Sequence, residues 1–411
     1  MKNLIVGQSG GPTAVINCSL YGVIKEALSH KEKIGTVYGM INGIEGFLKD
    51  TILNITEDMS DETMEGLKIT PGAYLGSCRY KLPEDLSDPV YPKLFEKFEQ
   101  YHIGYFFYIG GNDSMDTVSK LSRYASSIGS DIKVMGIPKT IDNDLVHTDH
   151  TPGFGSAAKY VASTVCEIGI DASVYNAKSV TIVEIMGRHA GWLTGAAVLA
   201  RKYEGDNPVL IYLPEVPFST DRFLSQIEEA LKTRNNLVVC VSEGIQDAEG
   251  TFICEYASDA GVDSFGHKML TGCGKYLENL IKDRLGIKVR SVELNVSQRC
   301  STACQSLTDA KEGEMAGRFG VQKALEGQTG FMTAFVRKTA EASKTGDNYG
   351  ISCTLVDVNE VCNKEKTVPT EWITKDGSDI ADEFIAYALP LIQGTPEIPY
   401  KNGIPAYVYR H

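Results

Sequence analysis

The sequence lacks the features that would place it in a membrane or in an oxidising compartment. It has no apolar run long enough to span a membrane, and the apolar part of its opening residues, MKNLIVGQSGG, is too short for a secretory signal peptide. Its ten cysteines include no C-x-x-C pair, and the nearest two, Cys300 and Cys304, have no histidine beside them. We therefore expect reduced, mostly buried thiols and a cytoplasmic location.

Positive charge is also scarce. The chain has 40 Lys and Arg residues against 53 Asp and Glu, which gives a formal net charge of −13. This balance argues against nucleic acid or an anionic membrane as a partner. An anionic small ligand would have to be held by local Lys and Arg side chains against the overall field.

What the sequence does contain is an alternation of apolar, strand-like runs with helix-like segments. Its 411 residues exceed one ordinary core, and 43% hydrophobic and 23% charged residues are typical of a soluble globular protein. The strand-like runs are NLIVG (3–7), YFFYIGG (105–111), DIKVMGIP (131–138), SVTIVEI (179–185), NPVLIYLP (207–214), NLVVCVSEG (236–244) and VRSVELNVSQR (289–299). The alternation predicts an α/β fold of two lobes, with mainly parallel sheets covered by helices. It weakens after about residue 330, and we expect 330–411 to pack on the first lobe as an extension.

Glycine-rich motifs follow two of these strands. In parallel sheets ligands gather at the carboxyl ends of strands, and the glycines of GQSGGP (7–12) and GGNDS (110–114) allow the backbone to approach a phosphate closely. GQSGGP has neither dinucleotide nor P-loop spacing, so a plain strand–turn–helix joint is an equal alternative for it. Asp113 needs its own explanation, because a carboxylate binds phosphate poorly without a cation between them.

PKTIDNDL, residues 138–145, places two carboxylates and a lysine on a loop after a strand. Asp142 and Asp144 lie two residues apart, and Lys139 is close by. Paired carboxylates can divide the work, because one accepts a proton while the other helps to hold a divalent cation. The alternative is an Asx-rich turn that caps a helix, which three charged groups at one strand end disfavour.

Further charged residues follow other strands. Arg188 of MGRHAGW stands at the expected start of a helix, where it could clamp a phosphate, whereas we expect His189 to be a packed or capping histidine. Glu243 of VSEG is suited to sugar hydroxyls, with a solvated loop position as the alternative. The arginines that could also be plain surface charge are Arg79, Arg290 and Arg299. Together, these groups predict phosphoryl transfer to a phosphorylated, hydroxyl-bearing substrate.

The motifs SGGP, GGNDS, PKTIDND, MGR, SEG and QR, in this order and spacing, resemble those of the phosphofructokinase family. The resemblance covers roughly residues 1–320, and TIDND together with MGR is its most specific part. It implies two Rossmann-like lobes with the active site in the cleft between them, and transfer of a phosphoryl group to the C1 hydroxyl of fructose 6-phosphate with Mg²⁺. The donor lobe would comprise residues 1–154 and about 300–395, and the sugar-phosphate lobe 155–299.

The resemblance also implies roles for individual residues. The catalytic set is Asp142, as the base that accepts the C1 hydroxyl proton, with Lys139, Asp113 and Arg188. The residues expected to face the phosphoryl donor are Gly10, Gly11, Arg79, Gly111, Asn112 and Ser114. Those expected to hold the sugar phosphate are Thr140, Ile141, Asp142, Met186, Gly187, Arg188, Glu243, Arg290 and Arg299. The metal-binding set is Asp113, Asn112 and Asp144.

Two positions separate the donors used within the family. Members that use ATP have glycine where Asp113 and Lys139 stand, whereas members that use pyrophosphate have Asp and Lys there, as this chain does. A carboxylate where the α-phosphate of ATP would lie adds bulk and a like-charge repulsion of about 4 kcal/mol at ~4 Å and an effective dielectric constant of about 20. Lys139 can neutralise the phosphate that leaves. We therefore expect reversible transfer from pyrophosphate to fructose 6-phosphate.

Three positions depart from the family pattern. Asn112 stands where the family has a metal-binding aspartate, and an amide is a neutral and weaker Mg²⁺ ligand. Val296 stands where the family usually has a tyrosine or histidine. An arginine that reaches across subunits in many bacterial members aligns with Ser179, beside Lys178. Two alternatives therefore stay open: an ATP-dependent enzyme with an altered donor pocket, and a catalytically weak regulatory subunit. The expected assembly is a homo-oligomer, a dimer or a tetramer.

Overall fold

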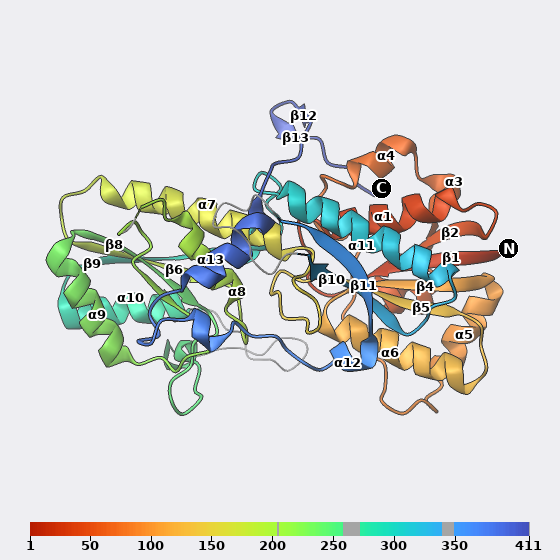
Figure 1. Cartoon of the computed structure of the whole chain (residues 1–411), viewed down its shortest axis with the longest axis horizontal. Coiled ribbons are helices and arrows are strands. Elements are labelled where there is room, and N and C mark those ends of the chain that lie inside the picture. The colour runs from red at the N-terminus through yellow and green to blue at the C-terminus, as the bar shows by residue number, and fades with distance from the viewer. Residues whose placement is uncertain (204, 258–271, 339–348, 411) are drawn as a thin grey trace.

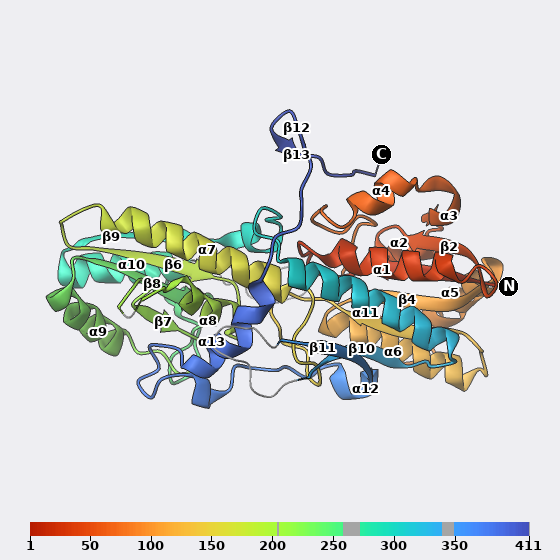
Figure 2. The same ribbon diagram turned by 45° about the horizontal axis from the view of Figure 1, so that its top comes forward.

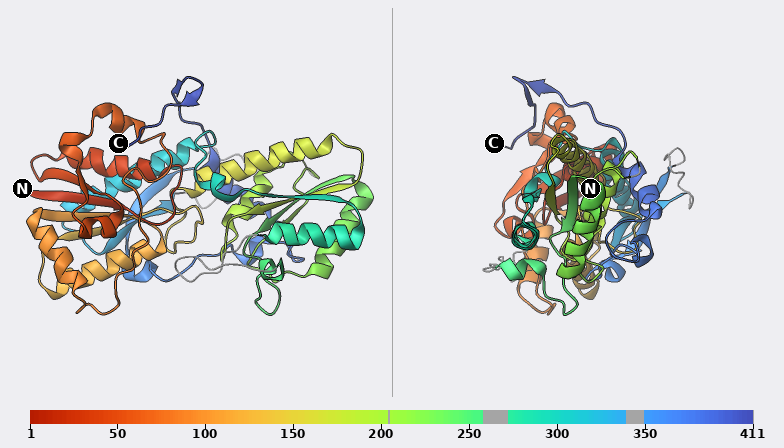
Figure 3. Two further views of the ribbon diagram at one scale, coloured as in Figure 1. Left: turned by 180° about the vertical axis from the view of Figure 1, so that it is seen from behind. Right: turned by 90° about the vertical axis from the view of Figure 1, so that its left-hand side faces the viewer.

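The computed structural model describes residues 1–203, 205–257, 272–338 and 349–410. These residues form two lobes along the long axis of the molecule, each built on one main sheet with helices on both faces (Figure 1). Seen from behind, the two sheets remain separate, and α7 runs along the second of them (Figure 3). The expected fold class is therefore confirmed.

The first lobe contains a seven-stranded sheet in the order β11-β10-β5-β4-β1-β2-β3. β3 and β11 run antiparallel to their neighbours, and the other pairs are parallel. The strands are β1 (Lys2–Gln8), β2 (Ile34–Met40), β3 (Ile52–Asn54), β4 (Ile103–Gly110), β5 (Lys133–Pro138), β10 (Phe331–Arg337) and β11 (Ile351–Asp357). The helices are α1 (Ile16–Ser29), α2 (Gly43–Leu48), α3 (Ile55–Asp58), α4 (Asp61–Gly66), α5 (Val90–Gln100), α6 (Asn112–Ser127), α11 (Leu307–Leu325) and α12 (Val358–Val361).

Alternate side chains of the first sheet enter two separate cores. Leu4 and Val6 of β1 pack with α1 and α11, whereas Ile5 packs with α5 and α6 on the other face, and all three are fully buried. α1 and α11 lie side by side over their face of the sheet (Figure 2). A strand buried on both faces needs a continuous apolar run, which explains why NLIV predicts this strand.

The second lobe contains a four-stranded parallel sheet in the order β7-β8-β6-β9. The strands are β6 (Ser179–Ile185), β7 (Leu210–Tyr212), β8 (Asn236–Ser242) and β9 (Lys288–Glu293). The helices are α7 (Phe154–Ser173), α8 (Trp192–Gly195), α9 (Thr220–Thr233), α10 (Cys273–Leu285) and α13 (Asp382–Ala388), with short 3-10 turns such as η3 (Asn295–Arg299). Near the C-terminus, β12 (Tyr400–Lys401) and β13 (Ile404–Pro405) form a separate small hairpin. Within the described residues, no helix combines the length and apolar character needed to cross a bilayer.

The C-terminal segment differs from the expectation that 330–411 would pack on the first lobe. β10, β11 and α12 do belong there, but Phe384 and Leu391 are buried in the core of the second lobe with Val183 of β6. The chain then returns to the first lobe, where Val408 N donates a hydrogen bond to Thr70 Oγ1 (3.0 Å). The segment therefore joins the lobes. The assignment of one lobe to the donor and the other to the sugar phosphate stays a prediction.

Candidate active site

Residues that follow strands of both sheets line one cleft between the lobes, with a volume of about 720 Å³. β1 and β4 are neighbours in the sheet. The chain continues from β1 to β2 on one side and from β4 to β5 on the other, so the connections diverge between β1 and β4. Ligands of parallel α/β sheets bind at such a switch point. The predicted site residues that line the cleft are Gly10, Gly11, Arg79, Gly111, Asn112, Asp113, Ser114, Lys139, Thr140, Ile141, Asp142, Asp144, Met186, Arg188, Glu243 and Arg299.

Two glycine loops and Lys139 form one end of the cleft. Gly10 has a φ of +74°, a left-handed conformation that favours glycine. Lys139 is 3% exposed, and its Nζ donates a hydrogen bond to Gly11 O (2.6 Å). α6 begins at Asn112, directly after Gly111, so the positive end of its dipole is at the same place. This end of the cleft is therefore suited to an anion.

The charge of Lys139 is finely balanced. Burial lowers the pKa of Lys139 to about 8, although Asp142 and Asp144 act in the opposite direction. A phosphate against Nζ would favour the ammonium form, because opposite charges stabilise each other in a buried place. Binding of an anion and protonation of the lysine are therefore coupled.

The acidic loop after β5 is fixed from two sides. Asp142 N donates to Thr140 Oγ1 (3.1 Å), and that hydroxyl donates to Asp142 Oδ2 (3.3 Å). Between the acids, Asn143 has a φ of +56°, and its buried Nδ2 donates to Tyr387 OH (2.7 Å). Burial raises the pKa of Asp142, and burial together with Asp142 raises that of Asp144 to about 7. Both acids line the cleft, while Asn143 holds their loop to α13.

The opposite wall is held through the main chain of the loop after β6. Met186 N donates to Gln298 Oε1 (3.1 Å), and Gly187 N donates to Glu243 Oε1 (3.3 Å). Burial raises the pKa of Glu243 to about 7, although the hydrogen bond from Gly187 opposes the shift. Arg188 lies in the loop ahead of α8 and not at the start of a helix as expected. The wall thus presents an arginine beside a buried carboxyl group.

Three predicted residues are placed differently from the expectation. Gly187 does not line the cleft, and its N–H binds Glu243. Arg290 lies outside the cleft on β9, where its half-exposed guanidinium pairs with Asp171 (3.7 Å). Asn112 lines the cleft, but its Nδ2 donates to Lys364 O (2.6 Å) and its Oδ1 accepts from Asn363 N (2.5 Å). The amide of Asn112 thus fastens a distant segment of the chain, and its expected role as a metal ligand stays a prediction.

Other residues of the cleft were missed or misjudged from the sequence. His189, expected to be packed, lines the cleft with an exposed side chain. Lys81 was missed, although it stands two residues after Arg79, and its Nζ pairs with Asp113 Oδ1 (3.3 Å). The other missed residues are Gln298, Asn363 and Glu365. For Asn363 no local signal exists, since its partner Asn112 is some 250 positions away in the sequence, and Glu365 belongs to the same distant segment.

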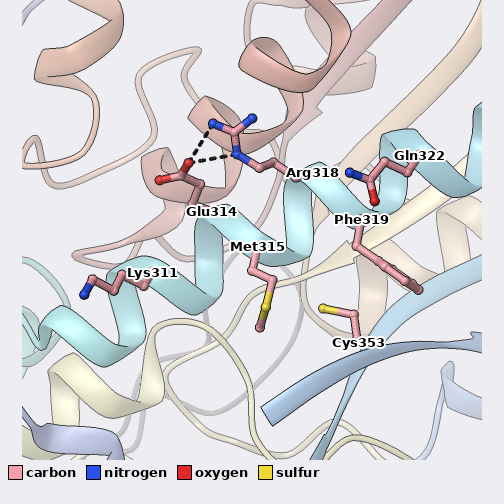
Figure 4. A pocket seen from close by; sticks show the side chains of 7 residues that line it. All are labelled: Lys311, Glu314, Met315, Arg318, Phe319, Gln322 and Cys353. Carbon is pink, nitrogen blue, oxygen red and sulfur yellow. Dashed lines mark hydrogen bonds and ion pairs between the residues drawn. The ribbon is translucent and has the colours of Figure 1, made fainter. Parts of the chain in front are cut away.

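A second, smaller hollow lies between α11 and β11 (Figure 4). Its volume is about 450 Å³, and it is lined by Lys311, Glu314, Met315, Arg318, Phe319, Gln322 and Cys353. Glu314 and Arg318 pair within it (2.8 Å), so their charges compensate each other. The cleft between the lobes is therefore the stronger candidate for binding a charged substrate.

Comparison with known proteins agrees with this geometry. The sequence profile of the family described as Phosphofructokinase matches residues 3–322. The pyrophosphate–fructose 6-phosphate 1-phosphotransferase of Methylococcus capsulatus is 40% identical over 411 residues, covering 99% of this chain and 95% of that protein. The crystal structure of a pyrophosphate-dependent phosphofructokinase from Nitrosospira multiformis superposes with a TM-score of 0.89 at 36% identity, covering 99% and 96% of the two chains. The ATP-dependent 6-phosphofructokinase of Corynebacterium efficiens is 29% identical over 368 residues, or 89% and 95% of the chains. This chain belongs to the phosphofructokinase family.

Proposed function

We propose that the protein transfers a phosphoryl group from pyrophosphate to the C1 hydroxyl of fructose 6-phosphate, giving fructose 1,6-bisphosphate and phosphate, reversibly, in glycolysis or gluconeogenesis. The observation that carries the proposal is the presence of Asp113 and Lys139 at the glycine-lined end of one cleft. Lys139 is buried there, and Asp113 pairs with Lys81. The ammonium of Lys139 can neutralise a compact, highly charged donor such as pyrophosphate. A nucleotide donor would instead be repelled by the carboxylate of Asp113. The similarity to proteins named for pyrophosphate supports the same donor.

The proposed chemistry assigns the proton to Asp142. Its carboxylate accepts the C1 hydroxyl proton while the C1 oxygen attacks the nearer phosphorus. The bond from that phosphorus to the bridging oxygen breaks, and inorganic phosphate leaves with the electron pair. Lys139 and the N–H groups of the glycine loops neutralise the leaving phosphate, while Arg188 and Arg299 stabilise charge near the sugar.

The carboxylates of the cleft fit Mg²⁺ as the expected cofactor. Asp144 Oδ1 is buried and has no hydrogen-bond partner in the described part of the chain, so a cation beside it would satisfy an otherwise orphaned oxygen. No group of three or more His, Cys, Asp and Glu side chains among the described residues is arranged as a metal site. Mg²⁺ normally needs only one or two carboxylates when phosphate oxygens and waters complete its shell. Asp144 and Asp113 would hold it, and its charge would offset that of the phosphates.

The first test assays purified protein with both donors in both directions. We expect turnover of pyrophosphate and fructose 6-phosphate with Mg²⁺, the reverse reaction from fructose 1,6-bisphosphate and phosphate, and little turnover of ATP. Equal or better rates with ATP would favour the ATP-dependent alternative. Binding of fructose 6-phosphate without turnover of either donor would favour a regulatory subunit. The expected homo-oligomer can be checked on the same sample by light scattering.

The second test replaces both donor-selective residues. Asp113→Gly combined with Lys139→Gly should abolish most pyrophosphate turnover, because the leaving phosphate loses its cation. Calorimetric binding of fructose 6-phosphate serves as the control and should be retained, since the sugar-side residues are unchanged. Undiminished pyrophosphate turnover in the double variant would reject the assigned roles.

A further inference from the structure

One part of the cleft wall comes from the C-terminal region. Residues 362–366, here named the strap, follow α12 and cross the first turn of α6. α12 packs beside α6 (Figure 1), and its Val358 and Val361 are fully buried. Two strap residues, Asn363 and Glu365, line the cleft together with the glycine loops and Asp113. The strap is therefore part of the wall that a phosphoryl donor meets.

The strap is fastened at several points along its length. The amide of Asn112, the first residue of α6, binds the main chain of both Asn363 and Lys364 (2.5 and 2.6 Å). Lys366 N donates to Asp144 O (2.7 Å), and Lys366 Nζ donates to two main-chain carbonyl oxygens in the segment that follows Asp144. Moving the strap would break these bonds together, which makes it a fixed wall and not a loose connection.

The strap also places one carboxylate in the wall of the cleft. Glu365 is exposed there and lines the same cleft as Asp113, Asp142 and Asp144. A donor with more than two phosphates would bring additional bulk and charge against Asp113, Asn363 and Glu365. Both effects act against a longer donor.

We propose that the strap limits the length of the phosphoryl donor, through the bulk of Asn363 and the charge of Glu365. Asn112 acts in this as a positioning residue, because its amide holds the main chain of the strap in place. The inference rests on the proposed function and adds a second barrier, from the far end of the chain, to that formed by Asp113. Linear tripolyphosphate is the appropriate probe, since it is longer than pyrophosphate by one phosphate and has no nucleoside.

The experiment measures kcat/KM for tripolyphosphate relative to pyrophosphate in three variants. Glu365→Gln removes the charge, and Asn112→Ala releases the strap. Glu360→Gln is the matched control, because Glu360 lies on α12 in an ion pair with Lys364 (2.9 Å) and does not line the cleft. We expect the ratio to rise about tenfold in Glu365→Gln, the effect of removing one like charge at close range. It should rise at least as much in Asn112→Ala and stay constant in Glu360→Gln.

Calorimetric binding of both polyphosphates to the same proteins separates this inference from the proposed function. A ratio that stays constant in both test variants, or wild-type protein that binds tripolyphosphate as well as pyrophosphate, would overturn the role of the strap while pyrophosphate turnover still stands. If the test variants bind tripolyphosphate with relaxed selectivity but the protein turns over no pyrophosphate, the role of the strap is supported and the proposed function is rejected. A change of the same size in Glu360→Gln would overturn the role given to the charge of Glu365, since Glu360 does not line the cleft.

Discussion

Asp142 is the residue on which the proposed chemistry depends most directly. Its carboxylate accepts a hydrogen bond from the Thr140 hydroxyl and faces a cleft that also contains Arg188. Asp142→Asn should lower kcat by about 10²- to 10⁴-fold, the usual contribution of a positioned base. KM for fructose 6-phosphate should change little, because the amide keeps the shape of the carboxylate. Steady-state kinetics at saturating pyrophosphate measure both constants.

The control for this variant is the neighbouring acid. Asp144→Asn should raise the Mg²⁺ concentration needed for half-maximal activity, since Asp144 Oδ1 is the orphaned oxygen near the donor. The two substitutions remove the same charge two residues apart, so different effects on kcat and on the metal requirement would separate their roles. A nearly normal kcat in Asp142→Asn would contradict the assignment of the base.

Lys139 should impose a pH limit on donor capture. Its pKa is lowered to about 8 by burial, so the free protein loses the positive charge as the pH rises through that value. kcat/KM for pyrophosphate, which reports the free enzyme, should therefore fall above about pH 8. Lys139→Arg should remove this decline, since a guanidinium stays charged. An identical alkaline decline in that variant would show that another group titrates.

At the scale of one element, the acidic loop depends on a hydroxyl from the C-terminal segment. Tyr387 OH accepts from Asn143 Nδ2 (2.7 Å) and donates to Asp149 O (2.8 Å). Tyr387→Phe leaves the buried Asn143 Nδ2 without its partner, whereas Asp149 O keeps the hydrogen bond from Lys366 Nζ. The unpaired amide should cost about 1–3 kcal/mol of stability. We also expect kcat to fall while KM stays nearly constant, because the loop loses the anchor between its two acids. Denaturant unfolding and steady-state kinetics test the two effects.

Tyr349→Phe is the matched control for this element. Tyr349 OH donates to Glu312 Oε1 (2.6 Å), so its loss also leaves a buried group short of a partner. Among the described residues, Tyr349 makes no hydrogen bond to the acidic loop. Stability should fall in both variants and kcat in Tyr387→Phe alone. If the two variants lowered kcat equally, the loop would have no special dependence on Tyr387.

For the molecule as a whole, the sequence predicted what is local and missed what is distant. β1, β4 and β6 are buried on both faces, so their continuous apolar runs were enough to predict them. The motifs that follow them line one cleft, as expected for the carboxyl ends of parallel strands. β11 escaped prediction because it is an edge strand with half-buried side chains. Asn363 and Glu365 escaped because only folding brings them to α6.

The segment that follows the acidic loop contains a buried histidine with two acidic partners. His150 Nδ1 lies 2.8 Å from Asp149 Oδ1, and His150 Nε2 lies 2.7 Å from Glu312 Oε2 on α11. Burial alone would lower the pKa of His150, but Glu312 and Asp149 outweigh it and raise the pKa to about 9. The charged form is therefore favoured in the folded protein, with Arg337 pairing Asp149 from the other side.

This arrangement predicts how stability depends on pH. The folded-state pKa of His150 lies above the unfolded value, so its contribution, on the order of 3 kcal/mol, is complete below about pH 6.5 and is lost as the pH rises through about 9. His150→Gln should accordingly destabilise the protein much more at pH 6 than at pH 10, as read from denaturant midpoints. His147→Gln, at an exposed histidine of the same segment, should leave both midpoints nearly unchanged. An equal loss at both pH values in His150→Gln would mean that the histidine stabilises the fold through packing, against Phe335 for example, and not through its charge.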